Sequence, residues 1–135
     1  MIIVDSSAII SLYFPEKYSE EVDKFLQKES DVHTLDLAFY EVASAIRKKV
    51  IRKEISAEDA KKIHEEIKTE LFDSLKIHHV DEVIDQAFEL ALNYNISVYD
   101  ASFLQLAIKY NGKLLTTDER LMNVQGLKKY FVELT

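Results

Sequence analysis

The 135-residue sequence contains no cysteine. This absence excludes disulfide bonds, thiolate metal sites and cysteine nucleophiles, and it is consistent with a cytoplasmic protein. Glycine occurs twice and proline once, so the chain has little that would mark a flexible linker or a domain boundary. No apolar run approaches the roughly 18 residues that a membrane helix needs. No basic region precedes the first apolar run, so neither a membrane anchor nor a signal peptide is expected.

The composition that remains is that of an ordinary globular protein, with 47% apolar and 30% charged residues. We therefore expect one domain over residues 1–135 with enough chain for a hydrophobic core. The net charge of −7 counts against a nucleic-acid-binding protein, which is usually basic. A local basic patch could still bind nucleic acid, and an acidic metal site would itself add negative charge.

Apolar periodicity predicts alternating strands and helices. Ser56 with Asp59 resembles a capping box, and Asn111-Gly112 is a helix C-terminal signal. Alternating elements predict an α/β fold whose parallel sheet is covered by helices on both faces. The expected strands are 1–4, 32–35, 75–80, 113–117 and 130–134, and the expected helices are 6–13, 16–29, 37–52, 56–71, 81–94, 99–110 and 119–124.

Two acids stand where a predicted strand ends. Asp5 closes the apolar run Met1-Ile2-Ile3-Val4, and Asp118 closes Lys113-Leu114-Leu115-Thr116-Thr117. Open α/β sheets bind ligands at the carboxyl ends of their strands, which makes both acids site candidates. The alternative is that each only caps the following helix, a position that Asp favours.

Two further acids stand among apolar neighbours. Asp100 lies near a predicted helix start and could also be a cap. Glu41 lies in helix 37–52, which is apolar almost all round and is therefore predicted to be buried. Its predicted inward stripe is Phe39, Ala43, Ile46 and Val50, with Glu41 opposite and Lys48 and Arg52 further along the Glu41 face. That face is either solvated or turned toward a cleft in which Lys48 and Arg52 contact phosphate.

Converging carboxylates need a cation. Two of them about 4 Å apart repel by about 4 kcal/mol at an effective dielectric of about 20. All-oxygen ligands select hard ions such as Mg²⁺ or Mn²⁺. Such a site can orient a phosphodiester and activate a water for attack on it, so the acids indicate phosphodiester hydrolysis.

Four segments together resemble the PIN-domain ribonucleases, in particular VapC-type toxins of toxin–antitoxin pairs. No single motif is specific, but the four occur in the family's order and span nearly the whole chain. The segments are Ile3-Val4-Asp5-Ser6-Ser7-Ala8, Tyr40-Glu41-Val42-Ala43-Ser44-Ala45, Tyr99-Asp100-Ala101-Ser102-Phe103-Leu104-Gln105-Leu106-Ala107 and Leu115-Thr116-Thr117-Asp118-Glu119-Arg120-Leu121.

The resemblance implies a sheet of order 3-2-1-4-5 and a Mg²⁺-dependent endoribonuclease. It implies homodimers and inhibition by a small antitoxin, and the apolar Ile9, Ile10 and Leu12 of the first helix favour such contacts. No acid follows Asp118 at a matching position, where Asn123 is nearest, so one metal site is better supported than two. The implied catalytic residues are Asp5, Glu41, Asp100 and Asp118, of which Asp5, Asp100 and Asp118 bind metal, with support from Ser6 and Thr116.

Other residues give weaker signals. His78 and His79 are adjacent in a predicted strand and point to opposite faces, so they are poor co-ligands, and His33 and His64 receive no role. Tyr13 and Tyr99 lie near the predicted site, where they either stack on RNA bases or pack in the core.

Three other classes of protein are alternatives. A phosphoacceptor receiver domain also has an acidic Mg²⁺ pocket, but Ser6-Ser7 follows Asp5 where it would have paired acids, and no Lys ends the last strand. A haloacid-dehalogenase-like phosphatase would have Asp where Ser7 stands. A non-catalytic partner-binding module with a PIN-like fold is the other alternative.

Overall fold

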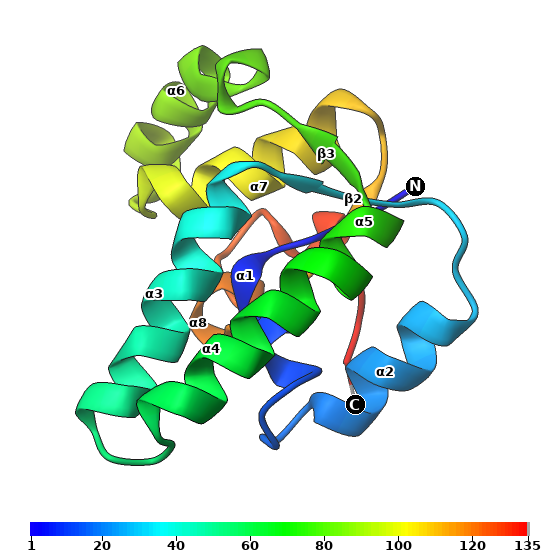
Figure 1. The fold of residues 1–135 in the computed structure, drawn as a ribbon. Coiled ribbons are helices and arrows are strands. Elements are labelled where there is room, and N and C mark those ends of the chain that lie inside the picture. The colour runs from blue at the N-terminus through cyan, green and yellow to red at the C-terminus, as the bar shows by residue number, and fades with distance from the viewer. Residues whose placement is uncertain (135) are drawn as a thin grey trace.

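The computed structural model describes residues 1–134. Its elements follow the alternation that the sequence predicts (Figure 1). Residues 67–71 form a π-helical turn between α4 and α5, and residues 80–82 and 128–130 form 3₁₀ turns. The main elements in chain order are β1 (Ile2–Val4), α1 (Ser6–Ser11), α2 (Ser19–Gln27), β2 (Val32–Leu35), α3 (Leu37–Ile51), α4 (Ala57–Glu66), α5 (Phe72–Ser74), β3 (Lys76–His78), α6 (Ile84–Tyr94), α7 (Val98–Lys109), β4 (Lys113–Leu115) and α8 (Glu119–Met122).

The four strands form a parallel sheet in the order β3-β2-β1-β4. The chain moves outward from β1 to β3 and then returns to the other side of β1 at β4. This reversal places the topological switch point between β1 and β4, where ligands bind in open α/β sheets. A receiver domain has the order 2-1-3-4-5, so the sheet excludes that alternative.

The predicted fifth strand is reduced to one bridge. Phe131 pairs in parallel with Leu114, and Val132 donates a backbone hydrogen bond to the Leu114 carbonyl. The preceding 3₁₀ turn includes Tyr130, the first residue of the predicted strand. The described residues after it lie beside β4 but form only this one bridge with it. Phe131 and Val132 are nevertheless buried, as the apolar pattern predicts.

Helices cover both faces of the sheet (Figure 1). Helix α7 packs on β1 and β4 with α6 outside it, whereas α1, α3 and α4 pack against one another on the opposite side. The strand residues Ile3, Leu35 and Leu114 are fully buried, as expected for parallel strands covered on both faces. No helix in residues 1–134 has the length and apolar character to cross a membrane.

The prediction that helix 37–52 is buried all round is wrong. Helix α3 buries Ala38, Val42 and Ile46, whereas Phe39 is 40% exposed and Tyr40 is 82% exposed. The helix lies in an outer layer and packs against α1 and α4, so only part of its circumference meets the core.

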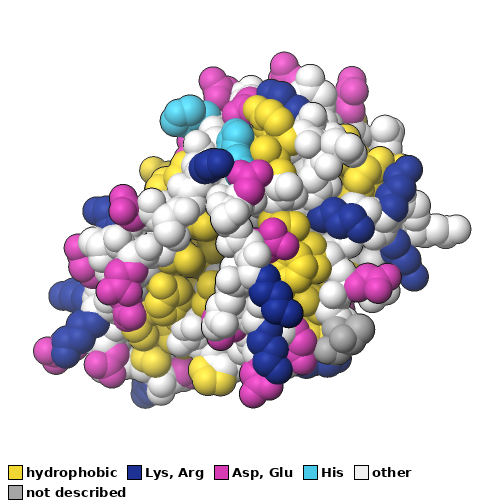
Figure 2. Space-filling view, turned by 90° about the vertical axis from the view of Figure 1, so that its right-hand side faces the viewer, with side chains coloured by type: hydrophobic (Ala, Val, Ile, Leu, Met, Phe, Trp, Pro, Cys, Tyr) yellow, Lys and Arg dark blue, Asp and Glu magenta, His cyan; other side chains and the backbone are white. Residues whose placement is uncertain are grey.

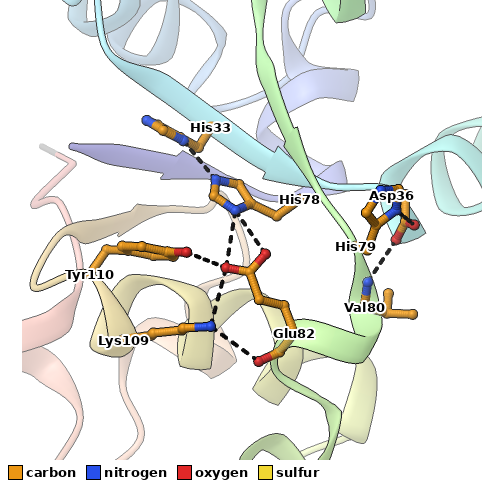
Figure 3. Close-up of polar contacts among 8 residues, drawn as sticks. All are labelled: His33, Asp36, His78, His79, Val80, Glu82, Lys109 and Tyr110. Atoms are coloured by element: carbon orange, nitrogen blue, oxygen red, sulfur yellow. Dashed lines mark hydrogen bonds and ion pairs between the residues drawn. The ribbon is translucent and has the colours of Figure 1, made fainter.

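The edge strand β3 is joined to β2 by a chain of polar contacts (Figure 3). His33 Nδ1 lies 2.8 Å from His78 Nε2. The outer ring nitrogens of the pair meet Asp31 at 2.7 Å and Glu82 at 3.0 Å. Hydrogen bonds, led by that from Lys76 to Asp31 and that from Tyr110 to Glu82, lower the pKa of each carboxyl to about 2. When all three hydrogen bonds form, each uses one ring N–H of the two imidazoles. Two neutral imidazoles have only two ring N–H groups between them, so the fully bonded pair carries one positive charge.

Candidate active site

A hollow of about 350 Å³ opens beside the carboxyl ends of β1 and β4. Its position is the switch point of the sheet, and all four acids that the sequence selects line it. The lining residues are Asp5, Ser6, Ser7, Ile10, Glu16, Glu41, Ala45, Asp100, Phe103, Thr117 and Asp118.

Asp5 is the most buried of the four acids. It leaves β1 and caps α1, where its Oδ1 accepts hydrogen bonds from Ala8 N at 3.0 Å and Ser7 Oγ at 2.7 Å. Burial raises the pKa of Asp5 to about 6, although hydrogen bonds from Thr116, Ser7 and Ala8 work in the opposite direction. The capping interpretation is therefore correct but incomplete, because a cap alone does not require a buried carboxylate.

Ser7 connects Asp5 to the neighbouring strand end. Its hydroxyl donates to Asp5, lies 3.1 Å from Thr116 Oγ1 and accepts from the backbone N–H of Thr117 at 3.0 Å. Thr116 is fully buried and accepts from the backbone N–H of Asp118. Hydroxyls thus fix the geometry between the first and fourth strands without introducing a positive charge.

Glu41 enters the hollow from α3. Ser6 donates to Glu41 Oε1 at 2.7 Å and so joins α1 to α3. Burial is the main cause of the raised pKa of Glu41, and the charge of Asp100 raises it further. Because Glu41 is half-buried and lines the hollow, the solvated-face interpretation does not hold for this residue. A carboxylate with a raised pKa is also a better proton acceptor than one with an ordinary pKa.

Asp100 and Asp118 complete the wall on the α7 side. Asp100 stands in the first turn of α7, where Ser97 is the cap, so Asp100 itself is not the cap. Burial raises the pKa of Asp100, and the charge of Asp118 raises it further. Asp118 caps α8 through hydrogen bonds from Arg120 N at 3.0 Å and Leu121 N at 3.3 Å.

The charges of these acids are coupled across the hollow. The charge of Asp100 acts on both Asp5 and Glu41, and that of Asp118 acts on Asp100. In residues 1–134, no three His, Cys, Asp or Glu side chains lie close enough together to hold a metal ion by themselves. Mg²⁺ does not require such a cage, because it keeps several waters and is bound through one or two carboxylates alongside substrate phosphates. The donor set therefore fits a hard divalent cation.

The predicted phosphate contacts lie outside this hollow. Its lining on α3 ends at Ala45, and Lys48 and Arg52 lie exposed further along the helix. The two tyrosines also lie apart from the lining. Tyr99 is 60% exposed, and partly buried Tyr13 has a pKa raised by burial and then by Glu66 and Glu70.

The first helix offers no free apolar face. Ile9 and Ile10 are 1% and 8% exposed, so they belong to the core of this chain. They therefore do not support a partner contact, because they pack in the hydrophobic core of this chain. An exposed apolar row lies instead on α6, at Ile84, Phe88 and Leu92.

Sequence reasoning missed three residues at the site. Glu16 lines the hollow, but its place in a loop gave no signal. Ser7, rather than Ser6, holds Asp5, since the two side chains point about 100° apart on the helix. Arg120 was overlooked although it stands two positions after Asp118, and its charge lowers the pKa of Asp100.

A family model described as the PIN domain matches residues 2–127. Ribonuclease VapC3 of Pyrobaculum aerophilum is 43% identical over 120 residues, which are 89% of this chain and 91% of that protein. Such identity over nearly the whole of both chains is sufficient to assign the family.

Solved structures share the fold at lower identity. Mycobacterium tuberculosis VapC20, described as a sarcin–ricin loop cleaving toxin, matches with a TM-score of 0.74 and 17% identity, covering 99% of this chain and 98% of that one. A toxin–antitoxin complex from Klebsiella pneumoniae matches with a TM-score of 0.67 and 18% identity, covering 94% of each chain. The chain therefore belongs to the PIN-domain family, of the VapC type that its 43%-identical relative represents.

Proposed function

We propose that residues 1–135 form a Mg²⁺-dependent endoribonuclease that serves as the toxin of a toxin–antitoxin pair. The observation that carries this proposal is the meeting of four acids from four elements in one hollow at the switch point of the sheet. The name of the relative Ribonuclease VapC3 supports RNA as the substrate. A non-catalytic module is less well supported, because it would not need acids held at raised pKa by burial.

Asp5, Asp100 and Asp118 would hold the cation, at most two of them directly and the rest through the waters that Mg²⁺ keeps, with Mn²⁺ as an alternative to Mg²⁺. When bound, the ion would neutralise these carboxylates, polarise a phosphodiester and lower the pKa of a water. Ser7 and Thr116 hold Asp5 in place through their hydroxyls. Ser6 aims Glu41 in the same way.

Glu41 is the group that we assign to the proton transfer. Water attacks the phosphorus, the bond from phosphorus to the leaving ribose oxygen breaks, and the Glu41 carboxylate accepts the proton of the water. The leaving oxygen takes a proton from solvent. The raised pKa of Glu41 favours this role.

The experiment that tests this function measures cleavage of total RNA by purified, partner-free protein. We expect cleavage with Mg²⁺ and none in excess chelator. Asp5→Asn should abolish it, whereas the matched control Asp59→Asn, at an exposed position in the first turn of α4, should cleave like wild type. Cleavage by wild type in excess chelator would exclude the metal mechanism.

An antitoxin partner is supported by the toxin–antitoxin complex among the fold neighbours. The structure offers a suitable surface between α3 and α4, where a groove of about 300 Å³ has an apolar floor. Its rim carries Arg47, Lys61 and His64, which suits an apolar helix with acidic flanks. Ala87 and Ala91 are buried on an adjoining side of α6, whereas Ile84, Phe88 and Leu92 form an exposed row. We assign this row to a homodimer.

A further inference from the structure

A second hollow adjoins the acidic one. It has a volume of about 300 Å³, and Asp100 and Asp118 line both hollows, so these two residues form the wall between them. A chain lying across that wall would occupy both hollows at once. The other residues that line the second hollow are Asn95, Ile96, Ser97, Arg120, Leu121 and Val124.

The second hollow is built from the α6–α7 turn and from α8. Asn95 ends α6 in the left-handed conformation, with φ 53° and ψ 46°, and Ser97 caps α7. Buried Leu121 and half-buried Ile96 and Val124 supply an apolar floor. An amide, a hydroxyl and a guanidinium above an apolar floor can recognise a nucleotide, with a base or ribose on the floor and hydrogen bonds at its edges.

Arg120 supplies the charge that the rest of the site lacks. Five acids line the two hollows, and among the described lining residues Arg120 is the one base. Its guanidinium is exposed and makes no ion pair within 4 Å to another residue of 1–134, although Asp100 feels its charge. On the face of the molecule that Figure 2 shows, charges of both signs are interspersed and no large basic patch gathers among the described residues.

We propose that the second hollow binds the nucleotide next to the scissile phosphate of single-stranded RNA, with Arg120 on that nucleotide's own phosphate and Asn95 on its base edge. This inference rests on the proposed ribonuclease function and adds a subsite to it. Arg120 is thereby a positioning residue, since its hollow lies beyond the wall from Asp5 and Glu41.

The test measures binding of fluorescein-labelled 12-nucleotide homopolymers of U, A and C, with Ca²⁺ in place of Mg²⁺, at several salt concentrations. One phosphate contact to a single strand contributes about 0.7 to the slope of log K against log salt. Arg120→Ala should reduce the slope by about that amount. If the variant and wild type bind equally at about 1 M salt, the variant should then bind about eightfold more weakly than wild type at about 50 mM salt. Arg120→Lys should restore most of the slope. Lys28 is exposed and lines neither hollow, so Lys28→Ala is the control that should leave the slope unchanged.

Asn95→Gly isolates base recognition. Glycine adopts the left-handed conformation without strain, so this variant removes the amide and keeps the turn. Binding to the three homopolymers should become more nearly equal while the salt slope stays at its wild-type value. Homopolymer preferences identical to wild type would remove Asn95 from the subsite.

Cleavage of a random-sequence RNA pool with Mg²⁺ separates this inference from the proposed function. Arg120→Ala should raise KM by about the same factor as it weakens binding and leave kcat within about twofold. An unchanged salt slope, or a loss confined to kcat, would overturn the assignment. If wild type binds RNA through Arg120 but does not cleave it, the subsite stands and the nuclease proposal fails.

Discussion

Replacing Asp5 by Asn should stabilise the metal-free protein while abolishing its activity. Burial raises the pKa of Asp5 from 3.8 to about 6. Above pH 6 the folded state therefore holds a carboxylate whose ionisation costs about 3 kcal/mol more than in the unfolded chain, at about 1.4 kcal/mol for each pH unit. Asn caps a helix about as well as Asp, and its carbonyl oxygen can accept the same bonds from Ala8 and Ser7.

The sign of the pH dependence follows from the direction of the pKa. Because the folded pKa lies above the unfolded one, the stability that protonated Asp5 gives is complete below pH 3.8 and is lost as pH rises to about 6. The variant does not lose it. The free energy of unfolding of the variant minus that of wild type should therefore grow between pH 4 and pH 6 and stay constant above.

Thermal melts in chelator measure this difference. A chain of 135 residues gains about 3–4 °C in Tm for each kcal/mol, so about 3 kcal/mol should make Asp5→Asn melt about 9–12 °C above wild type at pH 7.5 and close to it at pH 4. Added Mg²⁺ should raise the Tm of wild type by mass action and that of the variant much less. Asp59→Asn serves as control and should show no growing difference. A gap of equal size at pH 4 and pH 7.5 would refute the buried-carboxylate reasoning.

Four further expectations concern other parts of the chain. Asp100→Asn should eliminate cleavage and leave the metal-free protein as stable or more stable, because one like charge beside Asp118 is removed; full activity would refute this role. After metal is removed with chelator, Mg²⁺ or Mn²⁺ should restore RNA cleavage and Ca²⁺ should restore it poorly. Lys48→Ala with Arg52→Ala should raise KM and weaken the salt dependence of RNA binding, and an unchanged slope would leave both residues as solvated charges. Phe88→Glu should convert a dimer into a monomer in light scattering, and a wild-type monomer at high micromolar concentration would exclude the dimer.

The sequence predicts the frame of this fold well because its strands are short, apolar and buried on both faces. Ile3 and Leu114 sit at the centre of their strands with no exposed surface, and each strand leads to an acid that also caps a helix. Asp5 and Asp118 cap helices by bonding residues two or three positions further on, so their capping can be predicted from the local sequence. That the two strand-end acids line one hollow follows instead from the parallel pairing of β1 with β4.

The orientation of α3 could not be predicted in the same way. The helix carries apolar residues on most of its circumference, so periodicity does not select the face that meets the core. Packing against α1 and α4 selects Ala38, Val42 and Ile46 and leaves Tyr40 in solvent. Glu41 nevertheless lines the hollow, where its half-buried side chain accepts a hydrogen bond from Ser6.

The hydroxyls of the site support the proposal that its acids hold a cation. Ser6 and Ser7 hold Glu41 and Asp5 at 2.7 Å each, and Thr116 links Ser7 to the next strand. A lysine at either serine would hold a carboxylate equally firmly, but it would neutralise the charge and lower the pKa. Hydroxyls position the carboxylates without neutralising them, so burial, and to a smaller extent their mutual repulsion, raises the pKa of Asp5, Glu41 and Asp100. The hydroxyls thus fix the positions of the carboxylates without offsetting their negative charge. Arg120 is the one base among the described residues that line the two hollows, and its charge acts on Asp100.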